Sequence, residues 1–164
     1  MATLKGTVRL DSDSGDMDKQ RAELSGAYDL PDTLSHLLRR SHFFAEKLFA
    51  ERLGAHGVTS RQLALLVAVL HNPGASQKVL GRLIALDTNT VSDLVRRMVD
   101  KGLLERRASR TDRRSFAIEL TDKGTVTLRD IVADNGLYQR ALAENLSDHE
   151  REELKSLLRK MLGL

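Results

Sequence analysis

Five arginines lie within ten residues of this chain, in the segment 105–114, beside only two acidic residues. Five positive and two negative charges leave the segment at +3, which equals the net charge of the whole chain. A guanidinium group donates several hydrogen bonds from a planar, weakly hydrated fork, so it binds phosphate and enters narrow, electronegative minor grooves of DNA. The arginines therefore indicate phosphate contact, or, in the simpler alternative, a solvated turn.

A second set of hydrogen-bonding residues precedes the arginines. In "TNTVSDLVRRMVDKG" apolar residues recur at helical spacing from Val91 to Val99, and Gly102 is a typical stop, which predicts an amphipathic helix. Its polar face carries Thr88, Asn89, Thr90, Ser92, Asp93, Arg96 and Arg97. Such side chains can reach base edges and phosphates when a helix lies in the major groove. Asp93 could accept from a cytosine, but an ion pair with Arg96 or Arg97 is favoured.

The elements around these residues have the order of a winged helix-turn-helix. A helix is predicted from the capping box of Thr59 and Gln62 to the turn at 72–74, and a short helix after Ser76. The apolar face expected for that short helix consists of Val79, Leu80 and Leu83. After the amphipathic helix, strands around 103–107 and 116–120, with Phe116, Ile118 and Leu120 on one face, predict a β-hairpin wing.

Long helices flank this middle region. Apolar residues recur at helical spacing from Leu34 to Phe49 and then from residue 121 to about 145. A second capping box, Ser147 with Glu150, predicts the beginning of a last helix with Leu154, Leu157, Leu158, Met161 and Leu162. The winged middle already closes its own core, so these terminal helices would bury their apolar faces by self-association. The predicted fold class is mainly α with a small β-hairpin wing, a winged helix-turn-helix with N- and C-terminal dimerisation helices.

Composition narrows the remaining choices. A chain of 164 residues with 41% hydrophobic content suits one domain, and the lack of cysteine excludes disulfides and thiolate sites. No apolar run approaches a membrane span and no secretory signal is evident, so we expect a cytoplasmic protein without membrane contact. Residues 1–32 hold four basic and seven acidic residues. We expect residues 1–29 to form a flexible acidic arm.

The segment 76–124 resembles the DNA-binding core of the MarR (multiple antibiotic resistance regulator) family. The resemblance rests on "VRRMVDKGLLERR", on Asp-Arg-Arg at 112–114, and on "LTDKG" after the second strand. It implies one domain over 30–164, with dimerisation helices at 30–56 and 122–164 and a winged lobe at 58–121. It further implies a homodimer on a pseudo-palindromic double-stranded DNA operator, with wing contacts from Arg113 and Arg114, one of them oriented by Asp112. Arg110 departs from the more usual acidic or neutral turn residue of the family, and we include it and Arg107 among the expected wing contacts.

The same resemblance implies a repressor released by a small-molecule effector that binds between the dimerisation helices and the winged lobe. The stretch "HLLRRSHFF" could supply this site, with Phe43 and Phe44 as apolar walls and Arg39, Arg40 or His42 as partners of a carboxylate or phenol. The effector class expected is an aromatic acid or its acyl-thioester. Alternatively, these residues pack a dimer interface or face solvent.

Other functions fit the sequence less well. His42 and Glu46 are one helical turn apart, but no tight metal-ligand spacing occurs, so we expect neither metal nor other cofactor. No spacing links an acid, base and nucleophile, so we expect no enzyme. The main alternative is a winged-helix protein-interaction module that docks an acidic partner, and the exposed arginines in place of apolar side chains argue against it.

Overall fold

A computed structural model of the chain describes residues 13–108 and 116–164. Its residues form two compact units, Met1–Phe43 and Phe44–Leu164. Within the described ranges no single helix is both long and apolar enough to cross a membrane. One pair of described segments, Leu34–His56 and Ser60–His71, meets these criteria only when the two are taken together, and the chain bends by 68° between them.

The first unit contains helix α1 (Asp13–Ala27), the short 3₁₀ helix η1 (Leu30–Asp32) and the beginning of α2 (Leu34–Leu53). The sequence pattern predicts no element over residues 13–27, because apolar residues are sparse there. All side chains described in α1, from Gly15 onward, are exposed. The flexibility expected of residues 1–29 stays a prediction, and residues 1–12 lie outside the described ranges.

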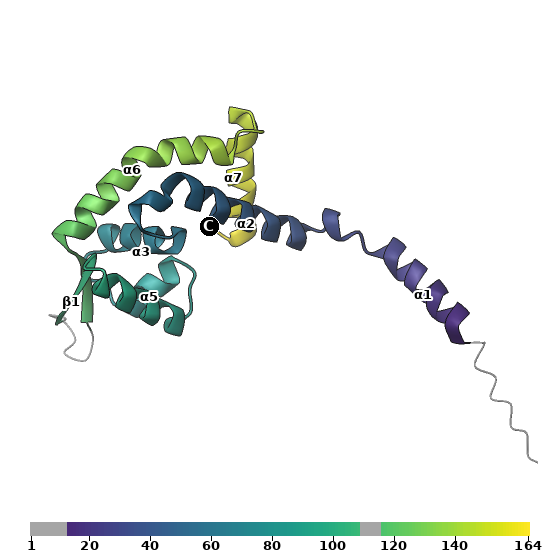
Figure 1. Ribbon diagram of the computed structural model, residues 1–164, viewed down its shortest axis with the longest axis horizontal. Helices are drawn as coiled ribbons and strands as arrows, with labels where there is room; N and C mark the ends of the chain where they lie inside the picture. The colour runs from purple at the N-terminus through teal and green to yellow at the C-terminus, as the bar shows by residue number, and fades with distance from the viewer. Residues whose placement is uncertain (1–12, 109–115) are drawn as a thin grey trace, which may run out of the picture. The chain divides into compact units, whose positions relative to one another are not determined.

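The second unit contains the winged lobe. After η2 (Gly54–His56) come α3 (Ser60–His71), α4 (Gln77–Leu83) and α5 (Thr88–Asp100), then the antiparallel strands β1 (Leu104–Ala108) and β2 (Phe116–Leu120). Leu104 pairs with Leu120 and Ala108 with Phe116. Helices α6 (Asp122–Leu142) and α7 (Asp148–Leu162) complete the chain. In Figure 1, α5 and β1 lie at one end of this unit and α7 at the other. The predicted fold class is confirmed.

One hydrophobic core joins the lobe to α6 and to the end of α2. Val91, Val95 and Met98 of α5 are fully buried, as the helical spacing predicts. The other large side chains that are fully buried are Leu53, Leu65, Leu66, Val69, Leu80, Leu104, Ile118 and Ile131. Since α5 and both strands contribute to this core, the hairpin and the helix before it are held by the same packing.

Side-chain caps fix where the helices begin. Thr59 with Gln62, and Ser147 with Glu150, form the two predicted capping boxes of α3 and α7. Gln62 is buried, and its side-chain oxygen also accepts from Lys101 Nζ at 3.3 Å. The beginning of α3 is thereby tied to the end of α5.

The apolar face expected for α4 is wrong in two of its three residues. Leu80 is buried, but Val79 and Leu83 are exposed. The reason is the close approach of α4 and α5 at Gly81, where an added Cβ would lie 3.0 Å from Val91 Cγ2. Gly81 is itself buried, so the contact face of α4 is centred on Leu80 and Gly81. Glycine has no apolar side chain, so the spacing of apolar residues could not show that Gly81 belongs to the contact face.

The "LTDKG" segment ties α6 to the base of the hairpin. Thr121 donates from its hydroxyl to the Gly102 carbonyl at 2.7 Å and from its backbone N–H to the Leu103 carbonyl at 3.2 Å. Lys123 Nζ donates to the Lys101 carbonyl at 2.7 Å. At Gly124, an added Cβ would lie only 2.0 Å from the Leu103 carbonyl oxygen. This position therefore admits only glycine without movement of the backbone.

We expect Gly124→Ala to lower the free energy of unfolding by about 1–3 kcal/mol, the usual range for overpacking, because the clash is with backbone atoms. Urea unfolding followed by circular dichroism measures this change. Gly136→Ala is the matched control in the same helix, since its Cβ would meet only the end of the Arg140 side chain, at 3.8 Å. The control should gain about 0.5–1 kcal/mol from helix propensity. Equal unfolding free energies for Gly124→Ala and the wild type would contradict the proposed close contact.

Candidate nucleic-acid interface

Helix α5 begins at a carboxylate cap. Asp87 Oδ1 accepts from the backbone N–H groups of Asn89 and Thr90, each at 3.0 Å, and Asp87 Oδ2 accepts from the Thr90 hydroxyl at 2.5 Å. The Thr90 hydroxyl and these N–H groups stabilise the ionised carboxylate, so the pKa of Asp87 is lowered below its ordinary value. Thr90, predicted to face DNA, thus uses its hydroxyl proton in the cap.

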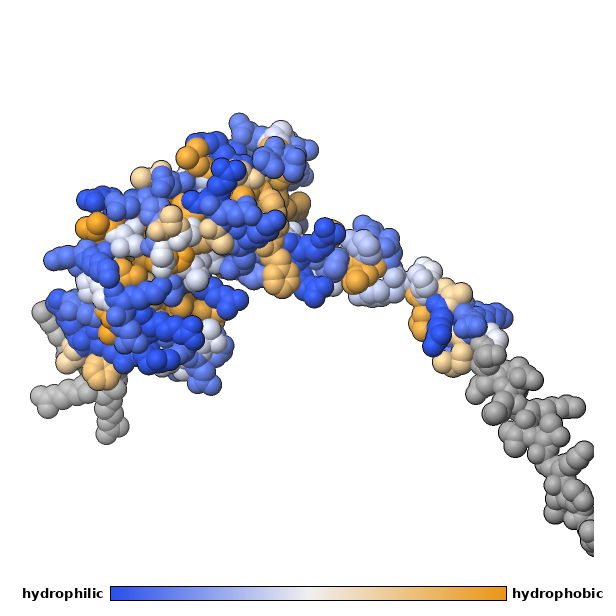
Figure 2. Space-filling view, in the orientation of Figure 1, coloured by the Kyte–Doolittle hydropathy of each residue, from blue (hydrophilic) through white to orange (hydrophobic). Residues whose placement is uncertain are grey.

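The rest of the predicted reading face is largely accessible. Thr88, Asn89, Ser92, Arg96 and Arg97 are exposed, whereas Thr90 and Asp93 are half-buried. Figure 2 shows a mainly hydrophilic surface, in blue, over this end of the unit. The structure therefore exposes five of the seven predicted residues, and Thr90 and Asp93 border a hollow that Arg61 and Gln62 of α3 also line. The contact of all seven with DNA stays a prediction.

Asp93 pairs with both arginines of this face, as its spacing favours. Its Oδ2 accepts from Arg97 Nη2 at 2.8 Å, and its Oδ1 accepts from Arg96 Nη2. Both arginine side chains remain more than half exposed. One carboxylate thus holds two guanidinium groups at the middle of α5.

Carboxylates also organise the described part of the hairpin. Glu105 and Glu119 are directly opposite each other in the two strands, which places like charges together. Arg107 Nη2 lies 2.6 Å from Glu105 Oε1, and Arg107 Nε lies 3.1 Å from Glu119 Oε2. The hydrogen bonds that Arg107 donates to Glu105, and the charges of both glutamates, raise the pKa of Arg107 above its ordinary value. Arg107, predicted to bind DNA, here forms ion pairs with two carboxylates within the hairpin.

The other wing residues named from the sequence, Arg110, Asp112, Arg113 and Arg114, lie outside the described ranges. Arg106, the remaining arginine of the segment 105–114, is exposed on β1.

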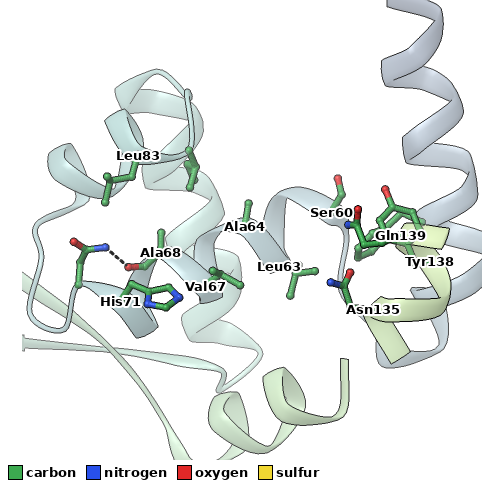
Figure 3. Close-up of a pocket in the computed structure, with 13 residues that line it drawn as sticks. Ser60, Leu63, Ala64, Val67, Ala68, His71, Leu83, Asn135, Tyr138 and Gln139 are labelled. Atoms are coloured by element: carbon green, nitrogen blue, oxygen red, sulfur yellow. Dashed lines mark hydrogen bonds between the residues drawn. The ribbon is translucent and has the colours of Figure 1, made fainter. Parts of the chain in front are cut away.

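A pocket of about 530 Å³ lies between α3 and α6, and Phe49 of α2 and the end of α4 also contribute to its wall. Figure 3 shows Ser60 and Leu63 of α3 at the same end of it as Asn135, Tyr138 and Gln139 of α6. Its full lining is Phe49, Ser60, Leu63, Ala64, Val67, Ala68, His71, Asn72, Leu83, Ile84, Asn135, Tyr138 and Gln139. A pocket of this size, with apolar walls and a few polar side chains, suits a small organic ligand.

Tyr138 lines this pocket, and its hydroxyl donates to the Ala45 carbonyl of α2 at 3.4 Å. Burial, and to a lesser degree the charge of Glu46, raise the pKa of Tyr138 above its ordinary value. Its ring packs edge-on against Phe49, with centroids 5.6 Å apart. The phenol is therefore a fixed hydrogen-bonding group beside the pocket.

None of the five residues proposed from the sequence for the effector site lines this pocket: Arg39, Arg40, His42, Phe43 and Phe44. The first four belong to the first unit, and Phe43 and Phe44 are both exposed. The effector role of these five residues stays a prediction. The sequence did not point to the pocket, because its lining residues on α3 and on α6 are more than 60 residues apart. Nothing in the local pattern of the sequence brings Ser60 and Asn135 together.

Known proteins of similar sequence and structure share this architecture. A model of the MarR family matches residues 56–115, from η2 into the hairpin. A protein of Thauera aromatica named for transcriptional regulation of the hcr operon is 31% identical over 125 residues, which cover 76% of this chain and 75% of the relative.

Two similar solved structures bear on ligands. A structure of the transcriptional repressor CouR bound to a 23-mer DNA duplex has a TM-score of 0.76 and 25% identity, and covers 81% of this chain and 94% of CouR. A structure of Bordetella bronchiseptica BpsR, whose DNA binding is regulated by 6-hydroxynicotinic acid, has a TM-score of 0.78 and 25% identity. That similarity covers 84% of this chain and 98% of BpsR.

Proposed function

The chain belongs to the MarR family of transcriptional regulators, and from this premise we propose that it is a homodimeric repressor released from a pseudo-palindromic operator by a small aromatic effector. Its family and relatives are transcriptional regulators and not enzymes. Within the proposal, the protein acts in the cytoplasm on double-stranded DNA.

The observation that carries the DNA-binding part is the placement of α5 beside the hairpin. Asn89, Ser92 and Arg96 are exposed on α5, and the hairpin that follows carries the arginine-rich segment. Buried side chains from α5 and both strands hold these two elements in one core. A helix in the major groove with a basic hairpin beside it can contact bases and phosphates at the same time.

DNA binding is tested by fluorescence anisotropy with the duplex upstream of the protein's own gene and with a random-sequence duplex. Arg113→Ala should weaken binding to both duplexes and reduce the slope of log affinity against log salt by about 1, because one phosphate contact is lost. Asn89→Ala should weaken binding to the upstream duplex by about 1–3 kcal/mol and leave random-duplex binding unchanged. Wild-type affinity and salt slope for Arg113→Ala would refute the wing assignment.

The observation that supports the dimer is the open apolar face of α7. No residue of this helix is buried within the chain, and Leu154, Leu157, Met161 and Leu162 are all exposed. Figure 2 shows apolar side chains, in orange, at the surface over α6 and α7. Such a continuous apolar face is typical of a surface covered by another chain. A second copy covers it in the proposed dimer.

Leu157→Glu should convert the dimer into monomers, because it places a charge in the middle of the α7 face. Burial of one leucine contributes about 1.5–3 kcal/mol, so the dissociation constant should rise at least tenfold. Analytical ultracentrifugation over a concentration series measures this change. Ser156→Glu introduces the same side chain on the opposite face of α7 and should stay dimeric. A wild-type dissociation constant for Leu157→Glu would place the interface elsewhere.

The effector part of the proposal rests on the pocket between α3 and α6. Its apolar walls, with Phe49 and Tyr138 at one end, suit an aromatic ring. Tyr138, His71 and Asn135 supply hydrogen-bonding groups for a hydroxyl or carboxylate. Because BpsR is regulated by 6-hydroxynicotinic acid, hydroxylated aromatic acids and their thioesters are the first ligands to test.

Ala64→Trp should fill the pocket and weaken effector binding at least about tenfold, which corresponds to 1.4 kcal/mol, without a change in DNA affinity. Isothermal titration calorimetry with 6-hydroxynicotinic acid, hydroxybenzoic acids and their coenzyme A thioesters measures it. Ala133→Trp, on an exposed position of α6 outside the pocket, is the matched control. Absence of heat from every ligand with the wild type would count against an aromatic effector.

A further inference from the structure

One half-buried carboxylate on the polar face of α5 engages two arginines. Asp93 uses a separate oxygen for each, one toward Arg96 and one toward Arg97. The three side chains form an Arg–Asp–Arg cluster with net charge +1, one and two turns from the N-terminal end of α5. The arginine side chains are 60% and 64% exposed, so burial does not explain the cluster.

This cluster is unfavourable for nonspecific DNA binding. If Arg96 or Arg97 turned toward a phosphate, its ion pair with Asp93 would break, and the freed carboxylate would lie close to the negatively charged backbone. A helix selected only for affinity would carry a neutral side chain at position 93. The carboxylate therefore disfavours those complexes in which the arginines contact only phosphate.

The same cluster is complementary to one kind of base pair. A carboxylate offers about four acceptor sites, and Asp93 uses two of them for the arginines. The free sites can accept from the N4 amino group of cytosine, while a guanidinium group donates to N7 and O6 of guanine. In the major groove both sets of atoms belong to a C·G pair. The intact cluster can thus bind this pair without separating its charges.

We infer that Asp93 determines the sequence specificity of this regulator: it holds Arg96 and Arg97 for a C·G pair in each half-site and opposes their contact with phosphates elsewhere. This inference rests on the proposed role of α5 as the helix that enters the major groove. Asp93 acts on base choice both directly, toward cytosine, and by positioning the two arginines.

The test compares Asp93→Asn with Asp100→Asn, which removes the same charge from the exposed last residue of the same helix. Full-length wild type and both variants are used to select binding sites from a randomised duplex pool, and the selected sites are sequenced. Wild type and Asp100→Asn should enrich an inverted repeat with a C·G pair at one fixed position in each half. Asp93→Asn should enrich the same repeat with its preference at that position reduced roughly tenfold.

Affinity for a random-sequence duplex gives a second readout that altered folding would not produce. Asp93→Asn should bind this duplex more tightly than Asp100→Asn does, with a log–log salt slope steeper by about 1 to 2, because two arginines become free for phosphates. Equal helical circular dichroism of the variants establishes that both are folded.

The possible outcomes distinguish the role of Asp93 from the proposed operator binding. Identical motifs and salt slopes for Asp93→Asn and Asp100→Asn would overturn the role of Asp93 while leaving the regulator intact. Failure of the wild type to enrich any inverted repeat would overturn the proposed operator binding, and the inference with it.

Discussion

The geometry of the proposed DNA-binding surface depends on one backbone contact, the approach of Gly124 to the Leu103 carbonyl. Leu103 lies three residues after the end of α5, and Gly124 belongs to the first turn of α6. The hairpin begins and ends between these two residues, so their contact closes its base. Thr121 and Lys123 add hydrogen bonds to the carbonyls of Gly102 and Lys101. The helix before the hairpin, the hairpin and the helix after it thereby share one rigid junction.

In α5 and in the hairpin, ion pairs with carboxylates limit which arginines are free to bind a ligand. Arg107 is held between Glu105 and Glu119, where it relieves the repulsion of two facing glutamates. Arg96 and Arg97 are held by Asp93. Counting positive charges along the sequence overstates the number of freely moving guanidinium groups. In an exposed ion pair the Coulomb energy is small, but it fixes orientation, and orientation governs base recognition.

The sequence predicts those features that depend on neighbours along the chain. Both capping boxes, the buried stripe of α5 and the pair between Asp93 and its two arginines involve spacings of three or four residues, and all are present. The "LTDKG" motif could be recognised only by resemblance, since its glycine is required by a carbonyl that lies 21 residues earlier in the chain. The prediction of the buried face of α4 was wrong for a similar reason, because Gly81 packs against the next helix without a side chain of its own.

Features set by long-range packing were not predictable from local pattern. The pairing of Arg107 with Glu119 on the second strand depends on the register of the two strands, which no local spacing specifies. The pocket draws Ser60 from the first helix of the winged lobe and Tyr138 from the helix after the lobe, and no local spacing relates these two residues. The effector role expected of Phe43 and Phe44 stays a prediction.

Helix α6 provides the physical connection between the pocket and the wing. Gly124 in its first turn closes the base of the hairpin, and Asn135, Tyr138 and Gln139 further along line the pocket. About 14 residues separate these points, or roughly 21 Å of helix at 1.5 Å per residue.

Between the wing and the pocket, α6 is held at its middle by two contacts. Asp134 Oδ2 is 3.0 Å from His56 Nε2, and Ile131 is fully buried. A ligand that favours a different separation of α3 and α6 must therefore displace the wing or break the His56–Asp134 contact. Coupling of this kind requires only that the pocket and the operator favour different positions of one rigid helix.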